Sequence, residues 1–461
     1  MNAVLDFIHA NRDRFLDELK QFLAIPSISA LPAHQEDVKR CADWAAAEMT
    51  RIGLQNVTLF PTPGHPVIYG DWLHAAGAPT ILFYGHYDVQ PVDPLELWES
   101  PPFDATIRDG EIYARGAADD KGQVFMHFKA LEAHLSQNGK LPVNMKIILE
   151  GEEEVGSANL DDFVRAHKAD LAADVVVISD STMFDRGVPS MCYGLRGLCY
   201  FQIDVKSAST DLHSGMYGGA IANPGQVLAQ MLSQIKDKSS RIKVPGFYDD
   251  VQPLTDEERA EFAKLPFNEK KYRKDLGVAK LFGEPGYSTL ERVWARPTFE
   301  VNGLLSGFTG EGAKTVLPAQ AMAKVSMRLV PNQDPVKISD LFDAYVKRIA
   351  PKTVDVTVTR MQGGKPWMCD PHNDFVQAAA RAIEQGFGRR PVLVREGGSI
   401  PVVSTFQEEL GLPSVLFGVG LPDENAHAPN EKLDLGNLHN GIIASALLYE
   451  EIGALAGGST A

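Results

Sequence analysis

The stretch that most constrains the fold of this chain is residues 80–89, with the sequence TILFYGHYDV. Its apolar half is typical of a buried strand, and the strand ends at Gly85, just before His86 and Asp88. Ligands bind at the carboxyl ends of strands in open α/β sheets, so this pair stands where a site is built. Residues two apart on an extended chain point the same way, and we therefore expect Asp88 to accept a ring N–H of His86 and fix its tautomer. A simple turn-capping role is the alternative.

Short apolar segments alternate with amphipathic ones around this stretch. Helical spacing runs from Leu5 to Leu23 and ends at Pro26, and a second helix is expected at 36–52, closed by Gly53. The same patterns predict strands at 57–60, 67–69, 81–84, 144–149 and 174–178, and helices at 122–135 and 159–167. Such alternation predicts an α/β fold, a mostly parallel sheet with helices on both faces.

The pattern changes near residue 192 and returns after residue 364. In between, we expect an α+β domain with strands at 198–205, 321–330 and 354–359 and helices at 224–235 and 336–349. The alternation of strands and helices seen before residue 192 then resumes, with helices at 375–387, 400–410 and from about 434, and strands at 391–394 and 414–417. Two domains also suit 461 residues, because one core seldom serves so long a chain. The prediction is a first domain of 1–191 and 365–461 with 192–364 inserted; residues 244–297 carry no predicted role.

Charge and cysteine content exclude several classes of protein. The chain has 44 basic and 60 acidic residues, a net charge of −16, which argues against a nucleic-acid partner. Its four cysteines include no C-x-x-C pair, so neither a disulfide framework nor a thiolate zinc site is expected, and a reducing, cytoplasmic location fits. The first residues reach no long apolar run, so we expect neither a signal peptide nor a membrane span.

Acidic residues cluster in two further segments. Asp119 and Asp120 stand in the turn GAADDKG before a helix, where N-capping is the alternative role for Asp120. Four glutamates within residues 150–154 follow the strand at 144–149. They repel one another unless a cation gathers them, although a solvated charge run is the alternative.

Asp180 and His427 follow two more expected strands. Strand ends that converge on one sheet edge with His, Asp and Glu offer ligands suited to Zn²⁺ or Mn²⁺. Two divalent ions carry four positive charges, which Asp119, Glu154, Asp180 and a bridging hydroxide balance. This count leaves Glu153 free as a general base.

These segments resemble motifs of the M20 metallopeptidases, and most of all the cytosolic non-specific dipeptidase and carnosinase branch. The matching segments are HYDV at 86–89, GAADDKG at 116–122, EGEEEVGS at 150–157 and HAPNE at 427–431. The resemblance implies a dinuclear site, zinc first and manganese as alternative. One metal would be held by His86, Asp119 and Asp180, and the other by Asp119, Glu154 and His427, so that Asp119 bridges.

The resemblance also implies that Asp88 orients His86 and that Glu153 is the acid/base. The extra Glu152 leaves the register of this pair open by one position. The spacing to Gly156 and Ser157 favours Glu153 and Glu154.

The resemblance makes the inserted domain a lid and dimerisation domain. It implies that His213 crosses the interface of a homodimer and hydrogen-bonds the oxyanion in the partner's site; a satisfied loop histidine is the alternative. Arg328 resembles the group that pairs bidentately with a substrate carboxylate, and an exposed strand arginine is its alternative. The turn with Gly398 and Ser399 leads into a helix, so its backbone N–H groups can cradle the same carboxylate, unless it is only a structural turn.

The implied function is hydrolysis of dipeptides, or other short peptides with a free C-terminal carboxylate, by a metal-bridging hydroxide with a Glu base. An N-acyl-amino-acid deacylase of the same chemistry is one alternative. A metal-binding homologue without catalysis is the other, although competent residues fill every implied position.

Overall fold

The computed structural model describes residues 1–398 and 400–455. The chain divides into two compact units. The first comprises Met1–Tyr193, Cys369–Val394 and the chain from Thr405 onward, and the second comprises Gly194–Met368 and Arg395–Ser404. The boundaries predicted from the sequence are 191 and 364, and no sequence pattern indicates that Arg395–Ser404 belongs with the second unit.

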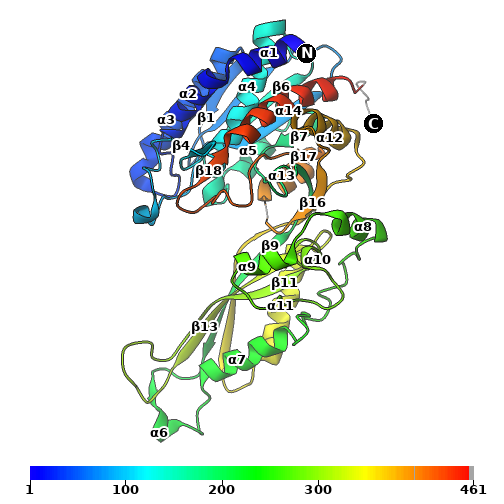
Figure 1. Cartoon of the computed structure of the whole chain (residues 1–461). Coiled ribbons are helices and arrows are strands. Elements are labelled where there is room, and N and C mark those ends of the chain that lie inside the picture. Colours follow the sequence, from blue (N-terminus) through cyan, green and yellow to red (C-terminus); the bar gives the residue numbers. More distant parts are fainter. Residues whose placement is uncertain (399, 456–461) are drawn as a thin grey trace. The chain divides into compact units, whose positions relative to one another are not determined.

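The largest sheet has a parallel centre and antiparallel flanks (Figure 1). Its order is β1-β2-β6-β3-β7-β17-β8-β15, and β16 also pairs with β8. Strands β6, β3, β7 and β17 run parallel to one another, while β1, β2, β8 and β15 pair antiparallel. Strand bounds are β1 Gln55–Phe60, β2 Val67–Trp72, β3 Thr80–His86, β6 Asn144–Glu150, β7 Val175–Ile178, β8 Ser190–Leu195, β15 Trp367–Met368, β16 Val392–Glu396 and β17 Ser414–Leu416.

Helices cover both faces of this sheet. Successive residues of β3 point to opposite faces, and each contacts a different helix. The ring of Phe83 stacks on His127 of α4 at 4.0 Å between centroids, whereas Tyr84 meets Phe406 of α13 edge-on at 5.5 Å. The predicted α/β fold is therefore confirmed. Helix bounds are α1 Asn2–Ala10, α2 Arg12–Leu23, α3 Gln35–Ile52, α4 Lys121–Asn138, α5 Leu160–Ala166, α12 Asp374–Phe387, α13 Pro401–Leu410 and α14 Leu435–Gly453.

Local signals at two helix ends behave differently. Gly53 closes α3 with φ of 107°, as predicted, because only glycine adopts this left-handed conformation without cost. The helical spacing between Leu5 and Leu23 is divided into α1 and α2 at Asn11. There the Asn11 side chain donates to the Phe7 carbonyl and accepts from Arg14 Nε.

The second unit contains a sheet of order β11-β13-β9-β14, antiparallel throughout. Its core includes Phe201 of β9 and Phe342 of α11, whose ring centroids lie 4.6 Å apart. The bounds are β9 Gly197–Lys206, β11 Thr298–Ser306, β13 Gln320–Leu329, β14 Asp355–Gly364, α7 Pro224–Ile235 and α11 Pro335–Ile349. The sequence predicts these elements except β11.

Shorter elements complete both units. In the second unit they are β10 Leu212–His213, α6 Ser214–Tyr217, α8 Asp256–Lys264, α9 Glu269–Asp275, α10 Thr289–Trp294 and β12 Val316–Leu317. In the first unit, β4 Thr106–Arg108, β5 Glu111–Tyr113 and β18 Lys432–Asp434 form a small sheet, and single turns lie at η1 Pro32–His34, η2 Leu95–Leu97 and η3 Glu153–Val155.

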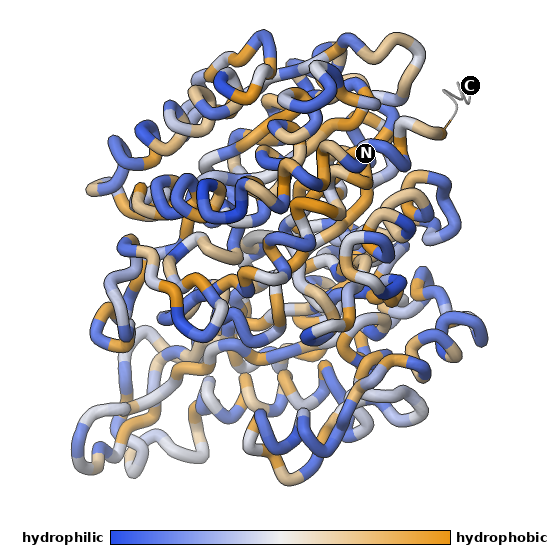
Figure 2. The backbone as a smooth tube through the Cα atoms, turned by 45° about the horizontal axis from the view of Figure 1, so that its top comes forward, coloured by the Kyte–Doolittle hydropathy of each residue, from blue (hydrophilic) through white to orange (hydrophobic). Residues whose placement is uncertain are grey.

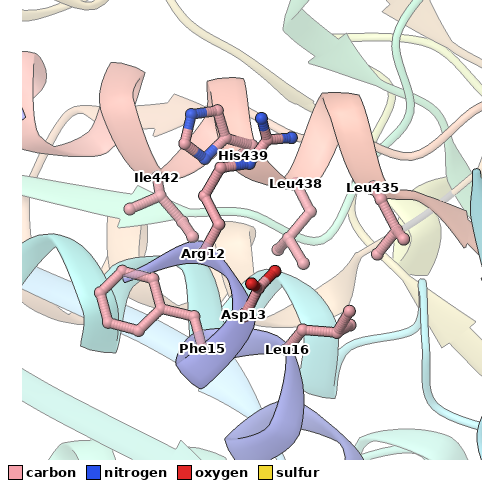
Figure 3. Close-up of a pocket in the computed structure, with 8 residues that line it drawn as sticks. All are labelled: Arg12, Asp13, Phe15, Leu16, Leu435, Leu438, His439 and Ile442. Carbon is pink, nitrogen blue, oxygen red and sulfur yellow. The ribbon is translucent and has the colours of Figure 1, made fainter. Parts of the chain in front are cut away.

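Hydrophobic segments run through the interior of the first unit, with hydrophilic turns outside them (Figure 2). Within the described residues, no helix is long and apolar enough to cross a membrane. A cavity of about 280 Å³ lies between α2 and α14, lined by Phe15, Leu438, Ile442 and the ring of His439 (Figure 3). It contains none of the predicted ligands.

Candidate metal centre

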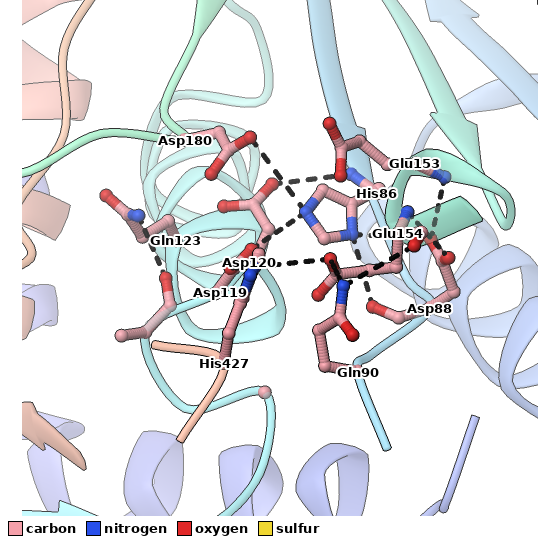
Figure 4. A network of polar contacts seen from close by, with 12 residues as sticks. His86, Asp88, Gln90, Asp119, Asp120, Gln123, Glu153, Glu154, Asp180 and His427 are labelled. Atoms are coloured by element: carbon pink, nitrogen blue, oxygen red, sulfur yellow. Dashed lines mark hydrogen bonds and ion pairs between the residues drawn. The ribbon is translucent and has the colours of Figure 1, made fainter. Parts of the chain in front are cut away.

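Two groups of potential metal ligands meet at the carboxyl ends of the parallel strands (Figure 4). One contains His86, Asp119 and Asp180, and the other Asp119, Glu154 and His427. In each group the ligand atoms lie within 4.8 Å of one another. His86 ends β3, Glu154 lies in η3 after β6, and Asp180 follows β7. Neighbouring parallel strands end at the same sheet edge, which is why residues so distant in sequence converge.

Asp119 lies between the two groups. Its Oδ1 is 3.1 Å from Nε2 of His86, and its Oδ2 is 2.8 Å from Nε2 of His427. Asp180 Oδ2 lies 3.9 Å from His86 Nε2, and Glu154 Oε2 lies 3.3 Å from His427 Nε2. Each oxygen of Asp119 thus faces a different histidine, the arrangement that a bridging carboxylate requires.

Asp88 has two tasks beside His86. Nδ1 of His86 lies 3.1 Å from the backbone carbonyl of Asp88 and 3.3 Å from its Oδ1, so both groups orient the ring. The same carboxylate accepts hydrogen bonds from Ser29 Oγ at 2.6 Å and from the backbone N–H groups of Glu153 and Glu154 at 3.3 and 3.1 Å. Asp88 therefore fixes both a ring and the turn with the two glutamates.

Two of the three consecutive glutamates bind different partners through their carboxylates. The carboxylate of Glu152 accepts both hydrogen bonds of the Asn159 side-chain amide, at 3.1 and 2.8 Å. Glu154 Oε2 accepts from Gln90 Nε2 at 2.7 Å, beside His427. This placement favours the register with Glu153 and Glu154 as the functional pair.

The site carries surplus negative charge. Burial raises the pKa of Glu153 to about 9, helped by the charges of Asp180 and Glu154, and burial with the charge of Asp119 raises the pKa of Asp180 to about 7. The hydrogen bonds that His427 donates to the carboxylates of Asp119 and Glu154 raise the pKa of His427 to about 10. Bound cations relieve such repulsion, and the donor set of two imidazoles and three carboxylates fits two divalent ions.

Asp120 does not behave as a side-chain cap. It is the N-cap residue of α4, yet its side chain makes no capping hydrogen bond. Instead Oδ2 accepts from the backbone N–H of His86 at 3.3 Å, and burial with the charge of Asp180 holds its pKa well above the usual range. The side chain thus supports the end of β3.

Sequence reasoning missed the polar groups that support the ligands, Ser29, Gln90 and Gln123. Gln123 donates to the Ala118 carbonyl at 2.9 Å and accepts from the Val419 N–H at 2.8 Å, and thereby joins two loops. Gln90 had a usable signal, since it follows Asp88 by two residues as Asp88 follows His86. Ser29 had none, because its contact is purely tertiary.

The remaining predicted residues belong to the second unit. His213 is exposed, and its Nδ1 accepts from the Gly215 N–H at 3.0 Å. Arg328 is partly buried in β13, which lowers the pKa of its guanidinium. The carbonyl of Gly398 accepts from the Arg196 N–H at 3.2 Å, and Ser399 lies outside the described residues. The roles of these residues stay predictions.

Comparison with known proteins gives concordant matches. The "Cys-Gly metallodipeptidase DUG1" of Candida albicans is 34% identical over 462 residues, covering 96% of this chain and 95% of the relative. The human "Beta-Ala-His dipeptidase" is 33% identical over 474 residues, covering 99% and 93%.

Solved structures agree. The crystal structure of human carnosine dipeptidase 1 superimposes with a TM-score of 0.81 at 33% identity, covering 98% of both chains. The M20 family metallo-carboxypeptidase Sso-CP2 of Sulfolobus solfataricus gives 0.85 at 33%, covering 96% of this chain and 99% of that one. Residues 82–451 match the family model described as "Peptidase family M20/M25/M40". The resemblance noted in the sequence is therefore confirmed: this chain is a peptidase and belongs to family M20/M25/M40.

Proposed function

We propose that the protein is a metal-dependent dipeptidase that hydrolyses dipeptides and other short peptides with a free C-terminal carboxylate. The observation that carries this proposal is the pair of ligand groups sharing Asp119, with the carboxylate of Glu153 beside them. The names of the relatives, metallodipeptidase and Beta-Ala-His dipeptidase, point to the same reaction.

Two divalent ions fit the donor set, with His86, Asp119 and Asp180 for one and Asp119, Glu154 and His427 for the other. Imidazole and carboxylate donors suit Zn²⁺ first and Mn²⁺ as the alternative. When bound, such ions polarise the scissile carbonyl and lower the pKa of water.

Glu153 has the position and the proton affinity of a general base and acid. Its raised pKa lets it accept a proton from the attacking water and keep it until the leaving amine takes it. Asp88 holds the groups of this step in position. Its carboxylate accepts from the backbone N–H groups of Glu153 and Glu154 and also faces the His86 ring.

The second unit supplies recognition and assembly in this proposal. Arg328 pairs with the substrate carboxylate, which the turn of Gly398 and Ser399 also cradles. His213 hydrogen-bonds the oxyanion in the site of a second copy, a contact worth about 3 kcal/mol. Support for a homodimer comes from exposed apolar side chains on this unit, among them Met216, Leu304, Leu305 and Phe308.

A cytoplasmic location is part of the proposal. Its support is that none of the four cysteines forms a disulfide, as expected in a reducing compartment.

The test is a substrate panel with defined metals. The purified protein is stripped with a chelator, reloaded with Zn²⁺ or Mn²⁺, and assayed on Ala-Ala-type dipeptides beside N-acetyl amino acids. We expect no turnover after stripping and recovery on the dipeptides with either metal. Recovery only on N-acetyl amino acids would make the protein a deacylase, and metal binding without turnover would make it a non-catalytic homologue.

A further inference from the structure

Glu431 is a fully buried carboxylate that accepts four hydrogen bonds and is not itself a member of either ligand group. It is 0% exposed. Its Oε1 accepts from the backbone N–H groups of Ala118 and Asp119 at 2.9 and 3.1 Å. Its Oε2 accepts from the N–H of Gly116 at 2.9 Å and from Arg115 Nη1 at 2.7 Å. The carboxylate thus holds the backbone of the turn from which Asp119 projects.

Arg115 fixes the carboxylate from the other side. The guanidinium is 1% exposed, and its Nη2 donates to the Pro91 carbonyl at 3.0 Å. The pair is therefore fully desolvated and hydrogen-bonded at both ends. Removing one member of such a pair costs far more than removing a surface ion pair.

Glu431 also anchors the segment that carries His427. Its carbonyl accepts from the Ala114 N–H at 3.1 Å, and the next residue begins β18, which pairs with β5. Lys432 N–H then donates to the Glu424 carbonyl at 3.0 Å, closing the loop around His427. One residue therefore joins the Asp119 turn to the His427 loop.

We propose that Glu431 is a positioning residue that sets the separation of Asp119 and His427, and so the affinity of the ligand group that contains both. This inference rests on the proposed function, because it assigns Glu431 to that metal centre. Supporting residues around metal ligands change metal affinity by about 10- to 100-fold when they are replaced.

The test compares Glu431→Gln with wild type. Glutamine keeps the size of the side chain but places an N–H₂ where one oxygen accepts from Gly116 and Arg115. In the Zn²⁺-titrated protein, we expect one of the two binding steps to weaken by about 10- to 100-fold. Turnover plotted against free Zn²⁺ should shift to higher concentration and reach a plateau near the wild-type value, because Glu431 contacts no reacting atom. In the metal-free protein, the amide hydrogen of Gly116, which loses its acceptor in this variant, should exchange faster.

The matched control is Glu132→Gln. Glu132 is also buried and also paired with cations, Lys129 and Arg51, but it lies in a separate cluster. We expect this variant to lose stability without any change in Zn²⁺ affinity. Arg115→Lys keeps the charge but cannot donate to Glu431 and Pro91 at once as the guanidinium does. It gives a second measure if Glu431→Gln does not fold, and it should weaken the same Zn²⁺-binding step to a smaller extent.

The failures of the two proposals are distinct. Wild-type protein that binds no Zn²⁺ or does not cleave dipeptides would contradict the proposed function. A wild type with two ions and normal turnover, beside Glu431 and Arg115 variants with unchanged isotherms and amide exchange, would overturn the positioning role alone. A plateau far below wild type at saturating Zn²⁺ would also overturn it.

Discussion

Glu153 and Glu154 are neighbours in the sequence, and their surroundings give them different chemistry. Glu154 is fixed by Gln90 and lies 3.3 Å from the His427 ring, which suits its proposed role as a ligand. For Glu153, burial and the charges of Asp180 and Glu154 raise the pKa to about 9. A carboxylate with that affinity for protons is suited to proton transfer, and bound cations bring its pKa back toward neutral.

We expect Glu153→Gln to keep both metals and lose nearly all turnover. Glutamine preserves the shape but cannot accept the proton, and general bases contribute about 10²- to 10⁴-fold to rate. The measurement combines metal content per chain with kcat on a dipeptide.

Glu152→Gln is the matched control, because it makes the same change one residue earlier. The Glu152 carboxylate binds Asn159, so this variant should retain most of its turnover. Brisk hydrolysis by Glu153→Gln, or a loss of turnover confined to Glu152→Gln, would contradict this assignment and indicate that Glu152 is the base.

At the residue scale, the sequence predicts the candidate ligands better than the residues that hold those ligands in place. His86, Asp119 and His427 are accessible to prediction because each follows a strand or precedes a helix, and strand ends converge. The roles of Asp120 and Gln123 depend on which carbonyl or N–H lies opposite them in the folded chain, and no local pattern encodes this.

A third cluster, formed by one carboxylate each from α2, α3 and α4, resembles a metal site in its geometry. Oxygens of Glu18, Glu48 and Glu132 lie within 4.8 Å of one another. Here the cation is already part of the protein: the amine of Lys129 contacts all three carboxylates, and Arg51 pairs with Glu48 and Glu132. The cluster ties α2, α3 and α4 together instead of binding an ion.

This cluster predicts a specific acid sensitivity. Burial opposes ionisation of Glu132, but the hydrogen bonds of Arg51 and the charge of Lys129 outweigh it and lower the pKa to about 2 from the usual 4.5. A carboxyl with a depressed pKa contributes stability above its unfolded-state pKa and loses it as the pH falls toward the folded-state value. The difference corresponds to about 3 kcal/mol.

We therefore expect Glu132→Gln to lower the free energy of unfolding by about 2 to 3 kcal/mol at pH 7. The gap to wild type should narrow as the pH falls from about 5 to about 2. Urea titrations at several pH values measure both quantities. A gap that stays constant with pH would show that Glu132 contributes through packing and not through its charge.

Whole elements were predictable where composition and periodicity agree. The helix α7 has the predicted bounds, Pro224–Ile235, because Asn223 caps it and Pro224 starts it.

Helices α8 and α10 escaped prediction although Thr255 with Glu258 and Ser288 with Glu291 form capping boxes. Each helix is short, so its cap is a stronger signal than its pattern. Strand β11 escaped because its residues are mostly exposed, which removes the alternation that marks a half-buried strand.

For the whole molecule, the proposed homodimer makes activity depend on two chains. We expect His213→Ala to lower turnover while leaving metal content intact, since His213 belongs to the second unit and the ligand groups to the first. Mixing this variant with a metal-site variant such as His86→Ala should restore part of the activity, because a hybrid dimer has one site with both a complete metal centre and a partner histidine.

The control mixes His213→Ala with Glu153→Gln,His213→Ala, a combination that provides no intact His213 to any site. It should show no recovery. Recovery in neither mixture, with hybrid dimers demonstrated by mass, would mean that His213 acts within its own chain or not at all.

The order of ligands along the chain has a consequence for biosynthesis. The first unit is assembled from separated segments, and His427 lies in the last of them. Domains fold as the chain emerges from the ribosome, N-terminal parts first. His86, Asp119 and Asp180 are available early, whereas the group with Glu154 stays incomplete until His427 has been translated. Under the proposed ligand assignment, a nascent chain can therefore acquire one ion before the second, and the peptidase becomes competent only after His427 has been added.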